Sequence, residues 1–173
     1  MPKKVLRKIL IPTDFSKLSL ESIEYTLAIF EPEDLQIYLL HAIDKAKIKK
    51  TKTKNKDADK LLGEIKKEAI KKLDNIADDY LENVYNVETV VRVGEPYSEI
   101  VKYAQQKNVD LIVISTHGRT GISHMLMGSV AEKVVRYSPT PVLTVKPEKL
   151  QLILMEQEDV DEQLHIKLKL NEK

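Results

Sequence analysis

Short apolar runs alternate with longer amphipathic stretches over most of the chain. The short runs are rich in β-branched residues and are bounded by polar residues, glycine or proline, which is typical of strands buried in a parallel sheet. They predict strands at residues 5–11, 35–42, 87–93, 111–114 and 142–145. Between them, apolar residues recur every three or four positions, and this spacing predicts helices at residues 17–30, 59–82, 97–107 and 128–137.

The regular order of strand and helix predicts an α/β domain in three layers, with a five-stranded, mostly parallel sheet between helices. Right-handed crossovers place helices on both faces of such a sheet. Ligands bind beyond the carboxyl ends of its strands, where the strand order reverses. We assign residues 1–147 to this domain and residues 148–173 to a C-terminal extension.

The C-terminal extension has a pattern of its own. Residues 150–155 are apolar, residues 156–163 are mostly acidic, and residues 164–170 alternate strictly between apolar and polar side chains. Alternation describes a strand with one covered face, so the extension predicts a β-hairpin for association, docked at the edge of the fifth strand or on another subunit. A disordered or helical tail is the alternative, because the acidic stretch is highly charged.

A lysine-rich stretch at residues 44–60 contains almost no large apolar residue and predicts a solvated loop. No aromatic residue is interleaved with its lysines, so the stretch lacks the stacking platforms of a nucleic-acid binding tract. The formal net charge of the whole chain is +1, which gives no general attraction to nucleic acid or to a membrane surface.

The chain contains no cysteine, which excludes disulfides and thiolate chemistry and agrees with a reducing cytoplasm. Near the N-terminus, Arg7 and Lys8 interrupt the apolar run, and no segment has the length of a membrane span. We therefore expect a soluble, cytoplasmic protein that binds neither membrane nor nucleic acid.

The most unusual chemistry follows the fourth predicted strand, in the stretch S-T-H-G-R-T-G-I-S-H-M-L-M-G-S. Gly118, Gly121 and Gly128 let backbone N–H groups approach an anion closely, and a helix that begins near Gly128 favours negative charge at its start. The stretch therefore indicates a phosphate-binding loop. A plain turn after a strand explains the glycines equally well.

A second group of residues, Pro12, Thr13 and Asp14, ends the first predicted strand. If the first and fourth strands are neighbours, this loop and the glycine loop face each other across one crevice. Asp14 is then a candidate ligand residue, although an aspartate after a strand also caps a helix. His41 and His117 have no partner at metal-ligand spacing, and we interpret both as packing or hydrogen-bonding residues.

Several separated segments resemble the universal stress protein family, in the family's order: K-I-L-I-P-T-D-F-S, L-L-H-A-I-D, V-G-E-P, V-D-L-I-V-I-S-T-H-G-R-T-G-I-S-H-M-L-M-G-S-V-A-E-K-V and T-P-V-L-T-V-K. The resemblance covers residues 1–147. It implies a Rossmann-like sheet of the adenine nucleotide alpha hydrolase-like type, with the first and fourth strands adjacent, and it implies a homodimer. One branch of the family binds ATP through the pattern G-x-x-G, nine residues, then G-S/T. Another branch lacks this pattern and binds no nucleotide.

Most of the ATP-binding pattern is present in this chain. The resemblance implies that Gly118, Gly128 and Ser129 hold the phosphates of ATP. It places Asp14 near the ribose and phosphates, with Mg²⁺ or Mn²⁺ as the candidate companion ion, and the backbone of Ala42 against adenine. The full set of cofactor-binding residues implied in this way is Pro12, Thr13, Asp14, Ala42, Ser115, His117, Gly118, Arg119, Gly128, Ser129 and Val130.

The chain departs from the pattern at Ser115, which stands where the family has its first glycine. If that position requires a positive φ, serine costs about 1 kcal/mol there. The departure supports an alternative function, a dimeric stress-response scaffold that binds no nucleotide, and Ser129 is then only the N-cap of the following helix. The favoured hypothesis is an ATP-binding regulatory protein of the stress response. An ATPase has the least support, because the loop has no Walker lysine.

Overall fold

The computed structural model describes residues 6–31, 35–46, 55–82, 84, 86–117 and 127–146. The strands are β1 (Lys8–Pro12), β2 (Gln36–Asp44), β3 (Asn86–Gly94), β4 (Leu111–Ser115) and β5 (Val142–Val145). The helices are α1 (Lys17–Ile29), α3 (Asn55–Tyr80), α4 (Pro96–Gln106) and α5 (Ser129–Tyr137). The predicted C-terminal hairpin lies outside the described residues.

All five strands are parallel, and their order in the sheet is β3-β2-β1-β4-β5. β1 is the central strand, with Ile9 opposite Ile37 of β2 on one side and opposite Leu111 of β4 on the other. The strand order reverses between β1 and β4, which places the switch point of the sheet between their carboxyl ends. The predicted α/β fold is confirmed, and so is the expected adjacency of the first and fourth strands.

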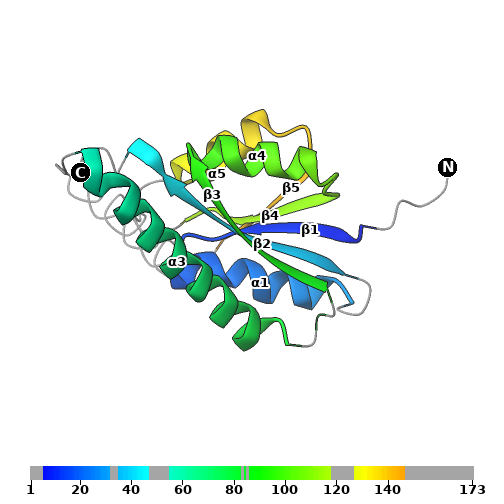
Figure 1. The fold of residues 1–173 in the computed structure, drawn as a ribbon. Coiled ribbons are helices and arrows are strands. Elements are labelled where there is room, and N and C mark those ends of the chain that lie inside the picture. The colour runs from blue at the N-terminus through cyan, green and yellow to red at the C-terminus, as the bar shows by residue number, and fades with distance from the viewer. Residues whose placement is uncertain are drawn as a thin grey trace, which may run out of the picture.

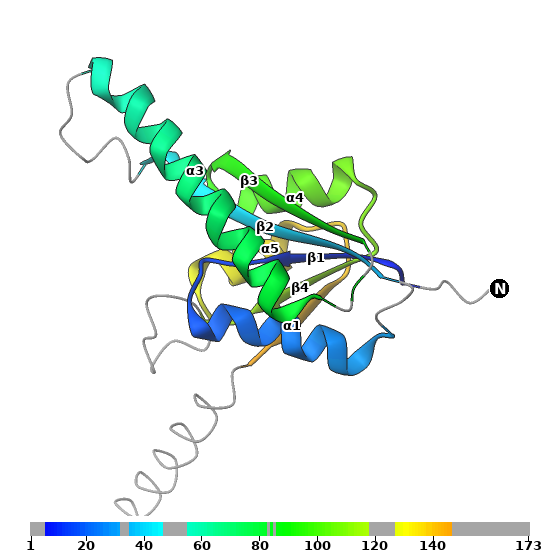
Figure 2. The same cartoon turned by 60° about the horizontal axis from the view of Figure 1, so that its bottom comes forward.

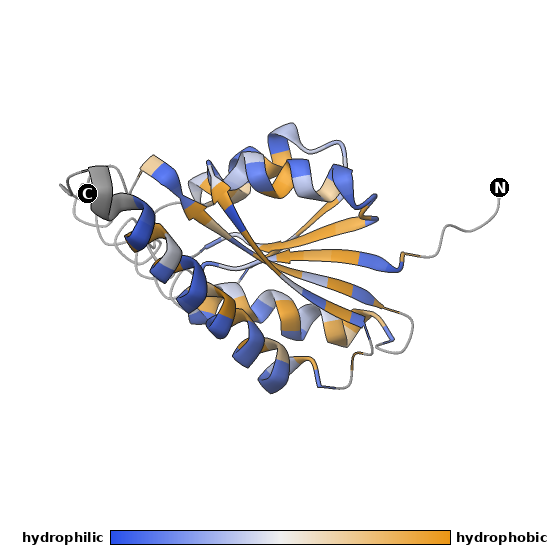
Figure 3. Cartoon of the chain, in the orientation of Figure 1, coloured by the Kyte–Doolittle hydropathy of each residue, from blue (hydrophilic) through white to orange (hydrophobic). Residues whose placement is uncertain are grey.

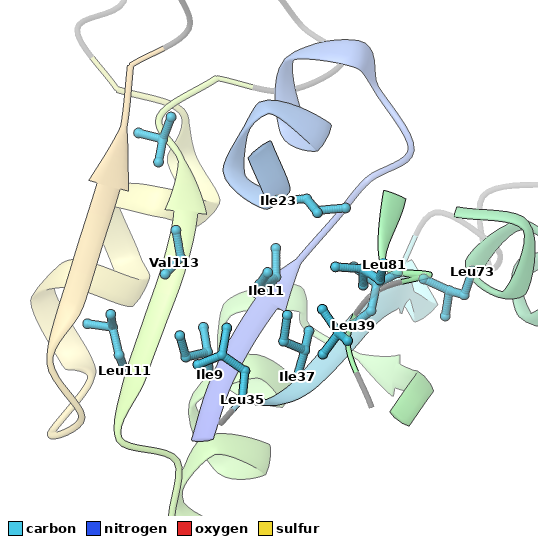
Figure 4. Close-up of a cluster of buried hydrophobic side chains, with 12 residues drawn as sticks. Ile9, Ile11, Ile23, Leu35, Ile37, Leu39, Leu73, Leu81, Leu111 and Val113 are labelled. Carbon is cyan, nitrogen blue, oxygen red and sulfur yellow. The ribbon is translucent and has the colours of Figure 1, made fainter. Parts of the chain in front are cut away.

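Helices cover both faces of the sheet, with α1 and α3 on one face and α4 and α5 on the other (Figures 1 and 2). Successive residues of each strand therefore enter two different cores. Ile9 and Ile11 belong to the cluster on the α1 and α3 face, whereas Leu10 belongs to the cluster on the α4 and α5 face. The strands carry most of the hydrophobic colour in Figure 3, and Figure 4 shows the first cluster.

Ser16 caps the N-terminus of α1. The Ser16 side chain accepts a hydrogen bond from the Ser19 N–H at 3.2 Å, and Ser16 itself has the extended backbone of an N-cap. This bond satisfies one of the N–H groups that a helix start leaves without an internal partner. The cap therefore fixes where the chain turns from the end of β1 into α1.

Helix α3 corrects the last part, residues 55–60, of the loop predicted at residues 44–60, and residues 47–54 of that loop lie outside the described residues. Asp44 is the last residue of β2, and the helix begins at Asn55, four residues before the predicted start. Lysine and many other charged residues have good intrinsic helix propensity, so the scarcity of large apolar residues did not exclude a helix here. Figure 2 shows the first turns of α3 extending past the edge of the sheet. In the part of the chain that the structure describes, no helix combines the length and apolar character needed to cross a bilayer.

Gly63 in α3 offers a simple test of the helix. A Cβ atom built on Gly63 has nothing within 4 Å, so alanine fits without a clash. Alanine also restricts the unfolded chain more than glycine does and favours the helix. We expect Gly63→Ala to raise the free energy of unfolding by about 0.5–1 kcal/mol, measured by urea denaturation. A loss of stability would contradict the placement of Gly63 in an open helical position.

Candidate functional site

A pocket of about 460 Å³ opens at the carboxyl ends of the strands, at the switch point between β1 and β4. It collects most of the residues predicted from the sequence: Pro12, Thr13, Asp14, Ala42, Ser115, His117, Gly128, Ser129 and Val130. Gly118 and Arg119, the other two predicted residues, lie outside the described residues. The end of β1 and the two described ends of the glycine loop, at residues 115–117 and 128–130, therefore line the same pocket.

The turn after β1 is held by short-range hydrogen bonds. The Thr13 N–H donates to the Leu40 carbonyl at 2.8 Å, which continues the sheet pairing by one residue. The Asp14 Oδ1 atom accepts from both the N–H and the hydroxyl of Ser16, at 3.0 and 2.6 Å. Since Ser16 is the N-cap of α1, the interpretation of Asp14 as the cap is wrong. Asp14 instead orients the residue that caps the helix.

Phe15 has a φ of 68°, one of the two positive values among the described non-glycine residues. Such a backbone is costly for a bulky residue and persists only where neighbours fix it. Here the Phe15 N–H donates to Thr13 Oγ1 at 3.0 Å, and the Phe15 ring lies 4.1 Å from the His41 ring between centroids. These contacts bend the chain sharply just after Asp14, at the mouth of the pocket.

His41 is a packing and hydrogen-bonding residue, as the sequence predicted. Its Nδ1 atom lies 2.8 Å from the Thr13 carbonyl oxygen. A carbonyl only accepts, so Nδ1 carries the proton and donates. The bond joins the end of β2 to the end of β1 and supports the turn that bears Asp14.

The end of β4 is ordered by the residue that departs from the family pattern. The Ser115 hydroxyl donates to the His117 carbonyl at 2.8 Å and accepts from the His117 N–H at 3.3 Å. Ser115 is not one of the described residues with positive φ. Serine therefore causes no left-handed strain at this position, and its hydroxyl adds two bonds that glycine cannot make. His117 also shares a hydrogen bond of 2.9 Å with the Thr116 hydroxyl.

Gly128 brings the start of α5 close to the end of β4. Its N–H donates to the Thr116 carbonyl at 2.6 Å, and a Cβ atom on Gly128 would lie only 3.1 Å from the same oxygen. This separation is tighter than ordinary van der Waals contact, so a side chain at Gly128 would press on the β4 loop. Glycine is favoured here by this close approach and not by its φ, which is −68°.

The start of α5 also corrects one prediction. Gly128 is the N-cap and Ser129 is the first helical residue, so the interpretation of Ser129 as N-cap is wrong. The Gly128 carbonyl already accepts from the Glu132 N–H at 2.9 Å, which is the first bond of the helix. In the described part of the chain, no side chain caps this helix start. Its first N–H groups and the positive end of its dipole therefore border the pocket and suit an anion.

Sequence reasoning missed the walls that α3 and α4 contribute. Ile65, Glu68, Ala69 and Lys72 line the pocket from α3, and Pro96 and Ile100 line it from α4. Ile65 and Ala69 belong to the apolar spacing that predicted a helix at residues 59–82, and that spacing gives no sign of a pocket. Most of the apolar lining comes from β2, α3 and α4, which also carry the charged residues Asp44, Glu68 and Lys72, whereas most of the hydroxyl groups come from the ends of β1 and β4 and the start of α5. The pocket thus has an apolar part and a polar part.

Glu68 and Lys72 form an ion pair on the α3 wall, with the Lys72 Nζ atom 2.6 Å from Glu68 Oε1. The hydrogen bond from Lys72, together with its positive charge, holds the pKa of Glu68 below its usual range. Lys72 Nζ also lies 5.7 Å from the centroid of the Phe15 ring. Within the described ranges, no cluster of three or more carboxylate, histidine or cysteine side chains is arranged to hold a metal ion.

Comparison with known proteins places this geometry in a family. The family model of the universal stress protein family matches residues 6–146. A universal stress protein of Methanocaldococcus jannaschii, MJ0577, is 35% identical over 153 residues, which covers 81% of this chain and 94% of the relative. The chain belongs to the universal stress protein family. The solved structure of MJ0577 covers 84% of this universal stress protein and 99% of its own chain, at 34% identity and a TM-score of 0.76.

Two more distant structures share the fold of this universal stress protein. An Arabidopsis thaliana family member solved with AMP bound has a TM-score of 0.60 at 19% identity, covering 82% of this chain and 92% of its own. A universal stress protein solved in complex with cAMP has a TM-score of 0.58 at 22% identity, covering 83% of this chain and 98% of its own. At these identities the likeness concerns the fold alone.

Proposed function

We propose that this universal stress protein binds an adenine nucleotide, ATP with Mg²⁺ or Mn²⁺, and acts as a nucleotide-dependent regulator of the stress response. The observation that carries the proposal is the pocket at the switch point, with an apolar part beside β2 and a polar part at the uncapped start of α5. A nucleotide has the same division, since its base is flat and largely apolar and its phosphates are anionic. The adenine nucleotides bound by family members of the same fold agree with this assignment.

The residues divide between the two ends of the nucleotide. Backbone N–H groups at the start of α5, beside Gly128, Ser129 and Val130, would hold the phosphates. Asp14 would lie near the ribose and phosphates and would contact the metal ion that accompanies them. The backbone of Ala42, at the end of β2, would contact the adenine. Bound ATP adds negative charge to the pocket and makes contacts that the free protein lacks. Regulation follows if a partner protein distinguishes the ATP-bound protein from the free protein.

Thermal unfolding with and without nucleotide tests the proposal. At free Mg·ATP of about 100 times Kd, mass action adds about 2.7 kcal/mol of stability, which raises Tm by about 5–10 °C in a chain of this size. GTP with Mg²⁺ is the matched control, because it presents the same phosphates with a different base. An unchanged Tm at millimolar Mg·ATP, with no nucleotide found by mass spectrometry in the purified protein, would favour the scaffold function instead.

Association and location complete the proposed function. We propose a homodimer or higher homo-oligomer in the cytoplasm, with the C-terminal extension at residues 148–173 contributing to the contact. Comparison of the full chain with a chain that ends at Lys149, by sedimentation equilibrium, separates the two parts of this proposal. An unchanged oligomeric state would remove the extension from the interface and leave the oligomer itself in place.

A further inference from the structure

Helix α3 brings a lysine, Lys72, to the wall of the pocket. The described residues that line the pocket include three carboxylates, Asp14, Asp44 and Glu68. Among these same described lining residues, Lys72 is the one lysine or arginine. From these described side chains, an anionic ligand meets more negative than positive charge, so the position of the Lys72 ammonium group matters for its affinity.

The position of Lys72 is set by two contacts. Glu68, one turn earlier on α3, holds its Nζ atom at 2.6 Å, and the Phe15 ring lies under the same atom with 5.7 Å to the centroid. Phe15 in turn stacks on His41 and has the sharply bent backbone that follows Asp14. The ammonium group is therefore held above the β1–α1 turn, on the same side of the pocket as Asp14.

The Glu68–Lys72 ion pair is weak enough for the lysine to leave Glu68 and bind another anion. The side chains are 65% and 49% exposed, and pairs this exposed are weak in water. An ammonium group has three N–H donors, and the bond to Glu68 uses one of them. The flexible four-carbon stem lets the group move while α3 stays in place.

We propose that Lys72 is a phosphate-binding residue of the nucleotide site, held by Glu68 until an anionic ligand enters. The assignment rests on the proposed nucleotide function and adds to it a charge from α3. A phosphate oxygen makes a stronger, charge-assisted partner for the ammonium than a ribose hydroxyl or a base edge does. The contribution of Lys72 to affinity should therefore increase with the negative charge of the ligand. It should not depend on the base.

Isothermal titration of wild type and Lys72→Met with Mg·ATP, AMP and adenosine tests the assignment. Methionine keeps the length and the helix propensity of lysine but removes the charge. We expect Lys72→Met to weaken Mg·ATP about five- to tenfold, AMP less, and adenosine not at all. Glu68→Gln releases the lysine and should tighten Mg·ATP about threefold. Lys71→Met is the matched control, since Lys71 is an exposed neighbour on α3 that does not line the pocket, and it should bind all three ligands as wild type does.

The outcomes separate this assignment from the proposed function. Equal Mg·ATP affinity in wild type and Lys72→Met would overturn the role of Lys72 and leave the nucleotide site standing. An equal loss for Mg·ATP and adenosine in Lys72→Met would also overturn it, because the residue would then contact the nucleoside. Failure of the wild-type protein to bind any of the three ligands would overturn the proposed function and this assignment together.

Discussion

Replacing Gly128 with valine should abolish the stabilisation of the protein by nucleotide. A Cβ atom at this position already lies 3.1 Å from the Thr116 carbonyl oxygen, and the two methyl groups of valine add bulk beside it. The start of α5 must then move away from the β4 loop. This movement displaces the backbone N–H groups that would face a phosphate. We expect Mg·ATP affinity to fall on the order of 100-fold, measured by titration calorimetry and by the loss of the Tm shift.

The same substitution also has a structural cost, which controls must separate from the loss of binding. Valine is a poor N-cap compared with glycine, so Gly128→Val should lower the free energy of unfolding by about 1–2 kcal/mol. Gly128→Ala should have an intermediate effect on both measurements, and Gly63→Ala should respond to Mg·ATP as wild type does. A normal Tm shift in Gly128→Val would show that the phosphates do not approach the start of α5.

Local signals were sufficient to predict the elements of this fold but not their order in the sheet. The bounds of β5 follow from a short apolar run that begins directly after Pro141, and the structure has the strand at the predicted residues 142–145. The neighbours of each strand depend on pairing between distant residues, such as Ile9 with Leu111, for which periodicity gives no signal. The adjacency of β1 and β4 was predicted from the family resemblance, which reflects the fold as a whole.

The two sides of the pocket differ in how well their residues could be predicted from the sequence. Asp14 and Gly128 stand at a strand end and a helix start, where ligands bind in parallel α/β sheets, so the sequence marks them as candidates. Glu68 and Lys72 look like an ordinary ion pair one turn apart on the surface of a helix. Only the path of α3 across β2 places this pair over the pocket, and that path is a result of tertiary packing.

Ser115 shows why a departure from a family pattern needs the structure for its interpretation. The sequence alone left open whether serine strains the backbone at that position. The structure answers through the hydroxyl, which binds both the N–H and the carbonyl of His117. Glycine would give this loop freedom, whereas serine fixes its first turn. Serine can therefore replace glycine at position 115, because its hydroxyl holds the loop by hydrogen bonds whereas glycine would only permit the turn.

Truncation of Ile9 to alanine should cause a large loss of stability. Ile9 has no exposed surface, and its neighbours across both strand pairs, Ile37 and Leu111, are buried as well (Figure 4). Removing its side-chain atoms leaves a cavity in the core between the sheet and helices α1 and α3, and close packing there limits its collapse. We expect the free energy of unfolding to fall by about 2–5 kcal/mol, measured by urea denaturation.

Ile70→Ala is the matched control for this substitution. Ile70 is 46% exposed on α3, so its truncation removes little buried surface, and alanine has the higher helix propensity. We expect a change within about 0.5 kcal/mol. Ile9 does not line the pocket, so the folded Ile9→Ala protein should still gain stability from Mg·ATP. An Ile9→Ala protein with wild-type stability but no Tm shift with Mg·ATP would contradict the assignment of Ile9 to the core alone. It would mean that Ile9 acts on the pocket without supporting the sheet.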